Sequence, residues 1–298
     1  MLDALGTEAS STPGGPEIDQ LSVADLIARM NERDATIATC VRSALPAIAA
    51  AVSAATDRMR DGGRLIYVGA GTSGRLGVLD ASEVPPTFGV DGVVVGIIAG
   101  GPDALRDAAE GAEDDAEAGA ADLAVIDVGP LDTVVGIASS GRTPYVLGAL
   151  EHAAERGALT IGVACNQGTP LGRAAMHGIE VPVGPEIVSG STRLGAGTAT
   201  KMVLNMISTA TMVQLGKTYG SLMVDMRASN AKLRHRAVRI VTEATGADDA
   251  AAVEALDASG WHAKPAIATI LTGLSPAEAS QALERAGGRL RTVIEERG

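Results

Sequence analysis

The sequence has few aromatic residues and a shortage of positive charge. Phenylalanine, tyrosine and tryptophan together make up 2% of the 298 residues, and acidic side chains outnumber basic ones to give a net charge of −12. Nucleic-acid-binding proteins use basic surfaces and aromatic rings on which bases stack, so we expect no nucleic-acid partner. Hydrophobic residues still account for 46% of the chain. They predict a core of Val, Ile, Leu and Ala, which is typical of parallel sheets flanked by helices.

Cysteine and histidine are also scarce, with two and four residues respectively. Cys40 and Cys165 lie far apart in sequence, and we expect two free thiols. The chain has no secretory hydrophobic region and no run of 18 apolar residues, so we expect a cytoplasmic protein without a membrane partner. No metal site is expected, because the four histidines show no metal-ligand spacing: they are His152, His177, His235 and His262.

A glycine- and hydroxyl-rich turn follows the first apolar strand predicted by the sequence, Leu65-Ile66-Tyr67-Val68. The turn reads Gly71-Thr72-Ser73-Gly74 and leads into an amphipathic stretch. Backbone N–H groups and the positive end of a helix dipole converge at such a turn and favour an anion. Glu83 follows nine residues after Gly74 and precedes Pro85-Pro86. A phosphate cradle with an acid close behind it suggests chemistry on a phosphorylated small molecule.

A second turn of the same kind follows the apolar stretch 133–138. It reads Ser139-Ser140-Gly141-Arg142-Thr143-Pro144, and Pro144 suits the first turn of a helix over 145–156. The carboxyl ends of parallel strands meet at one edge of a sheet, where α/β folds bind ligands. Both turns are therefore expected at the same edge.

Strand and helix signals alternate along the middle of the chain, which predicts a parallel sheet with right-handed crossovers. The remainder, from Met226 onward, is helical and predicts a small C-terminal helical bundle. We assign 1–20 to a loosely ordered arm, 21–225 to the α/β domain with its N-terminal helices, and 226–298 to the helical domain. The expected strands are 64–68, 93–98, 133–138, 158–164 and 179–183; the expected helices between them are 73–82, 103–119, 144–156 and 169–176.

The first turn also fits G-x-G-x-x-G, the pattern of dinucleotide-binding proteins. That pattern alone is weak evidence, and it requires an acid at the end of the second strand to hold the ribose. Here that strand ends in Gly100-Gly101-Pro102, so the ribose acid is absent. Close packing of strand and helix would explain Gly69 and Gly71, but it would not explain the paired hydroxyls of the two turns.

Long stretches of the sequence resemble one family. These are LIYVGAGTSGRLGVLDASEVPPTFG, GAEDD, VVGIASSGRTPYVLGAL, VGPEIVSGSTRLGAGTATKMVLNMIST and GKTYGSLMVDMRASNAKLR. Together they resemble the N-acetylmuramic acid 6-phosphate etherases, within the sugar isomerase domain superfamily. The likeness extends over residues 17–240 and more loosely over the C-terminal helices. The motifs are long and occur in the family's order, so they are highly specific.

This resemblance implies a carbon–oxygen lyase that needs no cofactor. The family converts N-acetylmuramic acid 6-phosphate to N-acetylglucosamine 6-phosphate and D-lactate, a step in reusing cell-wall sugar. By likeness, Glu83 protonates the departing lactyl oxygen and Glu113 handles the C2 proton. For Glu186 a binding or capping role and a catalytic role are both left open. The residues expected to contact the phosphosugar are Thr72, Ser73, Gly74, Ser139, Ser140, Gly141, Arg142, Thr143, Glu186 and Ser191.

The chain departs from the family pattern at four places. Val84 stands where the family has Cys, Pro102 where it has an acid, and Gly195 where it has Lys; Asn166-Gln167-Gly168-Thr169 replaces Asn-Pro-Gly-Ser. Two further functions stay open, a non-catalytic phosphosugar sensor and an aldose–ketose isomerase. The presence of both glutamates favours catalysis over sensing. The long apolar stretch 196–216 and the family likeness also predict a homodimer with its site near the subunit boundary.

Overall fold

The computed structural model describes residues 6–8, 17–107, 109–226 and 231–297. The chain forms two compact units. The first comprises 1–82 and 92–208, and the second comprises 83–91 and 209–298. The predicted domain boundaries at residues 20 and 225 stay predictions.

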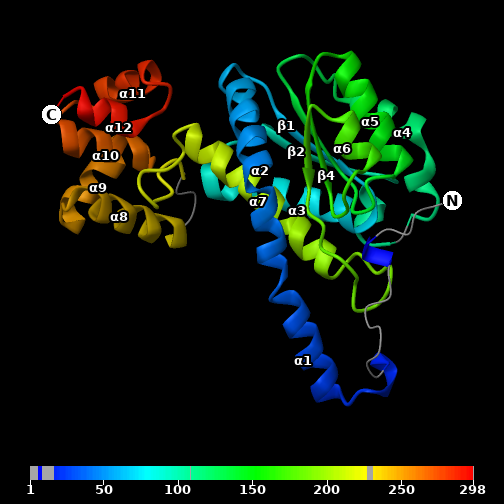
Figure 1. Cartoon of the computed structure of the whole chain (residues 1–298). Helices are drawn as coiled ribbons and strands as arrows, with labels where there is room; N and C mark the ends of the chain where they lie inside the picture. The colour runs from blue at the N-terminus through cyan, green and yellow to red at the C-terminus, as the bar shows by residue number, and fades with distance from the viewer. Residues whose placement is uncertain (1–5, 9–16, 108, 227–230, 298) are drawn as a thin grey trace. The chain divides into compact units, whose positions relative to one another are not determined.

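The first unit is built on a five-stranded parallel sheet (Figure 1). The strands pair in the order β2-β1-β3-β4-β5. This confirms the fold class expected from the alternating strand and helix signals. The strands are β1 (Leu65–Gly69), β2 (Val94–Ile98), β3 (Thr133–Ile137), β4 (Leu159–Ala164) and β5 (His177–Glu180).

Helices cover both faces of the sheet (Figure 1). Side chains alternate along a strand, so Ile66 and Val68 face one layer, where they join a core with α4 (Ala116–Val125) and α5 (Pro144–Glu155). On the other face lie α2 (Ile37–Arg60), α3 (Gly71–Phe88) and the start of α7 (Gly195–Gln214). The buried Tyr67 donates its hydroxyl to Asp80 Oδ2 of α3 at 2.8 Å. A polar bond thus ties α3 to the strand that precedes it.

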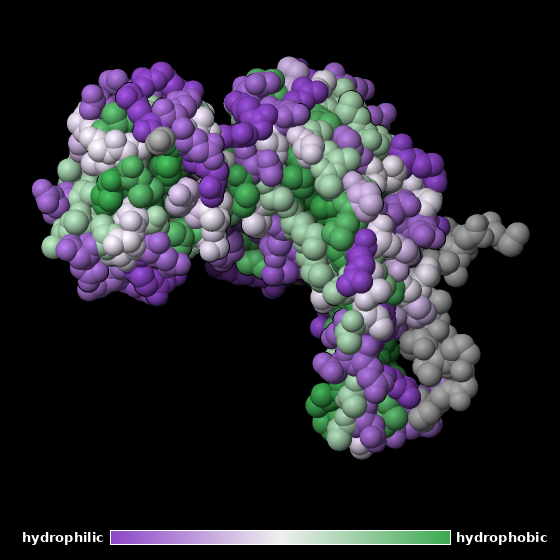
Figure 2. Space-filling model, turned by 60° about the vertical axis from the view of Figure 1, so that its left-hand side comes forward, coloured by the Kyte–Doolittle hydropathy of each residue, from purple (hydrophilic) through white to green (hydrophobic). Residues whose placement is uncertain are grey.

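The N-terminal helical region consists of two helices. Ser22 caps α1 (Val23–Asp34) by accepting from the Asp25 N–H at 3.2 Å, and α2 begins at Ile37. Among the described residues of α1 none is buried, and α1 projects from its unit (Figure 1). Val23 and Ile27 are 76% and 59% exposed. Figure 2 shows apolar surface at the lower end of the view, where α1 lies.

By length and composition, 23–60 is the one helical stretch in the described part of the chain that could cross a membrane. Ile37, Val41 and Ile48 on α2 are buried, and α2 packs against β3, β4 and β5. This packing is that of a core helix in a globular unit, and it accounts for the apolar character of the stretch.

Several predicted elements have different bounds in the structure. The predicted helix 103–119 is wrong: η3 (Pro102–Leu105) and η4 (Ala112–Asp114) precede α4, since Gly111 adopts a left-handed φ of 76° that ends the helical run. The predicted helix 73–82 extends to Phe88 and contains Pro85 and Pro86. A short α6 (Pro170–Ala174) precedes β5, which begins two residues before its predicted start.

The predicted loose arm over 1–20 is ordered at two places. Residues 6–8 form a 3-10 turn, η1, and Ile18–Gln20 form another, η2. The turn-rich Ser10–Pro16 segment lies outside the described residues. The location of residues 6–8 could not be predicted from the sequence, because they contact residues that are far away along the chain.

The second unit contains the predicted C-terminal helices. Their shared core includes Ile240, Leu256, Ile267 and Leu283. Residues 227–230, where the first of these helices was expected to begin, lie outside the described residues. The helices are α8 (Ala231–Thr245), α9 (Asp249–Ala258), α10 (Ala263–Thr272), α11 (Pro276–Arg285) and α12 (Leu290–Glu295).

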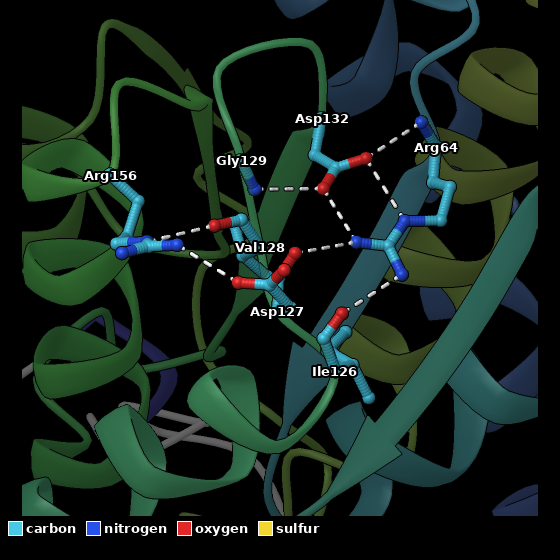
Figure 3. Close-up of polar contacts among 7 residues, drawn as sticks. All are labelled: Arg64, Ile126, Asp127, Val128, Gly129, Asp132 and Arg156. Carbon is cyan, nitrogen blue, oxygen red and sulfur yellow. Dashed lines mark hydrogen bonds and ion pairs between the residues drawn. The ribbon is translucent and has the colours of Figure 1, made fainter.

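A polar network fixes the amino ends of β1 and β3 (Figure 3). Arg64 donates from Nη2 to Asp132 Oδ2 at 2.7 Å and from Nη1 to the Ile126 carbonyl at 3.0 Å, and Gly129 N–H donates to Asp132 at 3.0 Å. Burial alone would raise the pKa of Asp132, but hydrogen bonds from Arg64 and Gly129 outweigh it, so this pKa is below its usual value. The network holds the sheet at the edge opposite the two hydroxyl-rich turns.

Asp132→Asn is expected to destabilise the first unit by about 2 kcal/mol, between the values for surface and buried ion pairs. Because the folded pKa of Asp132 is depressed, its stabilisation is present above the unfolded pKa of about 3.9 and is lost as the pH falls through the folded value. Urea unfolding at neutral and acidic pH measures both effects. Asp57→Asn, which removes an exposed pair with Arg60, is the control. Equal unfolding midpoints for the two variants would contradict the account.

Candidate functional site

The two hydroxyl-rich turns meet where the strand order reverses. β1 and β3 are neighbours, and Gly69 at the end of β1 pairs with Ile137 at the end of β3. The chain leaves β1 toward β2 on one side and leaves β3 toward β4 on the other. Ligands of open α/β sheets bind at such a switch point, beyond the carboxyl ends of the strands. The structure thus brings the predicted turns together at one edge of the sheet.

The first turn forms the amino end of α3. Thr72 is half-buried and Ser73 is buried, and both lie in the first turn of the helix, where N–H groups have no intrahelical acceptor. A Cβ at Gly74 would lie 2.6 Å from the Gly69 carbonyl oxygen. Gly74 is therefore required for close packing of the helix on β1. Its predicted contact with a phosphosugar stays a prediction.

The second turn joins β3 to α5. Ser140 Oγ accepts from the Arg142 N–H at 3.1 Å, and Thr143 precedes Pro144 at the start of α5. Gly141 has a left-handed φ of 66°, and a Cβ there would lie 2.4 Å from Thr169 Cβ. Glycine is thus needed for the fold of this turn, which leaves Ser139 and Ser140 half-buried at the edge of the sheet.

Glu113 lies beside the first turn. A cavity of about 220 Å³ is lined by Gly71, Arg75 and Glu113, among others. Arg75 donates to the carbonyl oxygens of Leu105 and Asp107, at 3.2 Å and 3.1 Å, and so holds the 102–107 segment near the amino end of α3. The cavity offers a carboxylate and a cation next to the expected anion-binding turn.

Glu83 occupies a different place on α3. It is exposed and follows Gly71 by twelve residues in the same unbroken helix, about 18 Å along its axis. Its neighbour Val84 is buried, at 3% exposed. Within a single chain, α3 therefore separates Glu83 from the turn at its own amino end.

Glu186 caps α7. Its two carboxylate oxygens accept from the Gly195 N–H at 2.9 Å and the Ala196 N–H at 2.8 Å, and the side chain is 1% exposed. The sequence leaves a binding, a capping and a catalytic role open for Glu186, and these bonds are those of a capping residue. Ser191 lies half-buried in the loop before α7, where its N–H donates to the Val188 carbonyl at 2.9 Å.

A cation lies next to Gly195, the position where the family has a lysine. A Cβ at Gly195 would lie 3.5 Å from Nη2 of Arg33 and 3.1 Å from Glu186 Oε2. Arg33 donates from Nε to the Pro185 carbonyl at 3.0 Å, and from Nη2 to the Val183 carbonyl. A positive charge from the N-terminal helices thus lies beside the position where the family has a lysine.

Asn166 was not predicted as a site residue. It follows β4, is 5% exposed, and donates from Nδ2 to the Ser139 carbonyl at 2.9 Å. The sequence signal was a polar residue directly after a third buried strand. In the sequence this position stands out only as part of the departure Asn166-Gln167-Gly168-Thr169 from the family pattern.

Comparison with known families gives two matches. Residues 47–154 match the glucokinase regulatory protein N-terminal SIS domain, and residues 114–213 match the SIS domain. A phosphoheptose isomerase from Francisella tularensis has a similar fold, with a TM-score of 0.52 and 17% identity, over 65% of this chain and 100% of that one.

Similarity to curated proteins extends over nearly the whole sequence. An N-acetylmuramic acid 6-phosphate etherase of Streptomyces avermitilis is 55% identical, over 98% of this chain and 94% of its own. The protein of that name from Rubrobacter xylanophilus is 57% identical, over 90% of this chain and 89% of its own. The chain belongs to the N-acetylmuramic acid 6-phosphate etherase family.

Proposed function

We propose that this protein cleaves the D-lactyl ether of N-acetylmuramic acid 6-phosphate, giving N-acetylglucosamine 6-phosphate and D-lactate. The observation that carries the proposal is 55% identity over 98% of the chain to an etherase of that name. The neighbouring carboxyl ends of β1 and β3 support it, since the two hydroxyl-bearing turns follow them at the edge of the sheet where α/β folds bind ligands. The enzyme is a carbon–oxygen lyase of cell-wall sugar recycling.

An unactivated ether resists hydrolysis, but elimination becomes accessible once the sugar ring opens. The C2 hydrogen is then adjacent to the C1 aldehyde and can be abstracted by a base, while an acid protonates the lactyl oxygen leaving C3. Water then adds at C3 across the double bond. A positioned base and acid each contribute about 10²–10⁴-fold. In our proposal Glu113 handles the C2 proton and Glu83 protonates the lactyl oxygen.

The phosphate is held by local donors, because the chain as a whole has a net charge of −12. The amino ends of α3 and α5 supply N–H groups and positive dipole ends. Hydroxyls come from Thr72, Ser73, Ser139, Ser140 and Thr143. No step of the scheme needs a metal or a cofactor.

Ser140→Ala is expected to weaken phosphosugar binding by about 1–2 kcal/mol, typical of a hydrogen bond to a charged group. The KM for the phosphorylated substrate would rise about 5- to 30-fold. Ser53→Ala, at an exposed position on α2, is the control and should leave KM unchanged. If unphosphorylated N-acetylmuramic acid is as good a substrate, the assignment of the turns to a phosphate is wrong.

Incubation of the purified protein with N-acetylmuramic acid 6-phosphate tests the function directly. D-lactate and N-acetylglucosamine 6-phosphate should form in equal amounts. The match to a regulatory-protein domain over 47–154 makes a phosphosugar sensor the second candidate. A sensor would bind the substrate without releasing lactate, and an aldose–ketose isomerase would give a ketose phosphate.

The enzyme is expected to work as a cytoplasmic homodimer. The exposed apolar side chains of α1 offer a surface for a second copy, and the axial separation of Glu83 from the first turn of α3 favours a site that receives residues from two chains. Sedimentation at micromolar concentration should give twice the 29.9 kDa of one chain. A species of one chain alone would reject the dimer.

A further inference from the structure

The N-terminal segment is docked at the carboxyl edge of the sheet. Thr7, in the turn Gly6–Glu8, is 1% exposed. Its N–H donates to Asn166 Oδ1 at 3.4 Å, and its hydroxyl accepts from Asn166 Nδ2 at 3.3 Å. Its carbonyl accepts from the Gly190 N–H at 3.2 Å. Thr7 thus uses all three of its polar groups on residues more than 150 positions away.

One of these partners bonds to a turn that carries predicted sugar-binding residues, and the other belongs to a loop that carries one. Asn166 also donates to the Ser139 carbonyl at 2.9 Å, so one amide side chain joins Thr7 to the turn after β3. Gly190 directly precedes Ser191 in the loop before α7. Thr7 therefore connects two loops of the candidate site that are far apart in sequence.

The hydrogen bonds that hold Thr7 are long. Its hydrogen bonds to Asn166 and Gly190 measure 3.2–3.4 Å, at or beyond the upper end, about 3.2 Å, of the usual range for N–H donors. The neighbouring Gly6 is not closely packed. A Cβ at this position would lie 3.5 Å from Asn166 Oδ1 and 4.0 Å from Gly184 Cα, which are ordinary van der Waals distances. Hydrogen bonds of this length open at a smaller free-energy cost than the ladders of the strands beneath them.

We propose that Thr7 is a positioning residue for phosphosugar binding: its docking on Asn166 and Gly190 holds the Ser139 turn and the Ser191 loop in their binding arrangement. By linkage, a phosphosugar that binds this arrangement stabilises the docked segment in return. The inference rests on the proposed function for the identity of the sugar. Thr7 does not touch reacting atoms, so it acts on substrate binding and leaves the chemical step nearly unchanged.

Steady-state kinetics of Thr7→Val and of a chain lacking residues 1–8 test the proposal. Loss of one hydrogen-bonding group should raise KM about 3- to 10-fold, and the truncation should raise it at least as much. The kcat should stay within about 2-fold of wild type. Thr39→Val, at an exposed position on α2, is the matched control and should leave both constants unchanged. An unchanged KM in the truncated chain would overturn the proposal.

A second measurement separates positioning from a structural role. Amide hydrogen exchange at residues 6–8 is followed in wild-type protein with and without N-acetylglucosamine 6-phosphate. In wild-type protein we expect the sugar phosphate to slow exchange about 10-fold at residues 6–8 and at the Gly190 amide, which donates to the Thr7 carbonyl. In Thr7→Val the ligand should no longer slow exchange at Gly190. Exchange at residues 6–8 that is unaffected by the ligand would reduce Thr7 to a structural contact and reject the proposal.

The two proposals fail in different ways. If the wild-type protein releases no D-lactate but N-acetylglucosamine 6-phosphate still protects residues 6–8, the proposed reaction is wrong and the positioning role stands. If D-lactate is released and the truncated chain keeps its KM, the reaction stands and the positioning role is wrong.

Discussion

Glu113→Ala is expected to stop exchange of the C2 hydrogen of the substrate with deuterated solvent. Glu83→Ala is expected to retain part of this exchange while losing D-lactate release. The physical reason is that an elimination needs two separate proton transfers. One group removes the C2 proton, and the other protonates the leaving oxygen. Each variant should lower the rate of lactate release by at least about 10²-fold.

Neighbouring acids provide the controls for this experiment. Asp114 shares η4 with Glu113, and Glu117 lies exposed in the first turn of α4. Asp114→Asn and Glu117→Gln should retain lactate release if Glu113 is the catalytic acid of the segment. Exchange that is abolished by Glu83→Ala and kept by Glu113→Ala would reverse the roles. Near-normal lactate release from both Glu83→Ala and Glu113→Ala would contradict the two-glutamate mechanism.

Asp225→Ala is expected to destabilise the second unit by about 3–5 kcal/mol, because it leaves a buried cation without its partner. Lys264, 3% exposed, donates to Asp225 Oδ2 at 2.6 Å, and to the carbonyl oxygens of Gly216 and Gly288 at 2.9 Å each. Lys217 lies 3.2 Å from the same carboxylate. Thermal unfolding of the full chain, monitored through hydrogen exchange in α10, measures this loss of stability.

The same carboxylate makes the stability of the second unit depend on pH. Burial would raise the pKa of Asp225, but the His262 hydrogen bond and the Lys264 charge lower it to about 2. A depressed folded pKa means that the stabilisation is complete above the ordinary value of about 3.9 and disappears as the pH falls toward 2.

Two variants separate the buried pair from a general effect of charge. Asp257→Asn removes an exposed carboxylate of α9 and should change stability by less than about 0.5 kcal/mol. Asp225→Leu combined with Lys264→Met removes both buried charges and should be more stable than Asp225→Ala alone. If the double variant is the less stable of the two, the unpaired cation is not the cause of the loss.

Local patterns in the sequence predicted the sheet and the two turns. The strand that precedes Gly69 and the one that precedes Ser139 are short apolar runs ending in glycine and hydroxyl residues, and this signal is contained within a few positions. Parallel pairing then required both turns to meet at one edge. The structure confirms that arrangement through the pairing of Gly69 with Ile137.

Contacts between distant residues could not be predicted in this way. Thr7 and Asn166 are separated by 159 positions, and nothing in the sequence around Thr7 marks it as buried. The bonds from Glu186 to the amino end of α7 span a loop whose path the sequence does not define. In each case a polar residue forms hydrogen bonds with backbone or amide groups that come near it only in the folded chain.

Helix boundaries were predicted poorly where glycine and proline conflict with periodicity. The stretch 103–119 has helical composition, but the left-handed conformation of Gly111 divides it. Pro85 and Pro86 suggested the end of a helix, yet α3 continues to Phe88. Val84 and Phe88 are buried at 3% and 4%, and this packing offsets the cost of proline inside the helix.

The reaction run in water labelled with heavy oxygen tests the central claim most directly. Elimination followed by water addition cleaves the bond between C3 and the ether oxygen, so D-lactate keeps the original oxygen. The label should appear in N-acetylglucosamine 6-phosphate, at C3, and none should enter the lactate hydroxyl. Label in that hydroxyl, or no release of D-lactate at all, would contradict the proposed etherase activity.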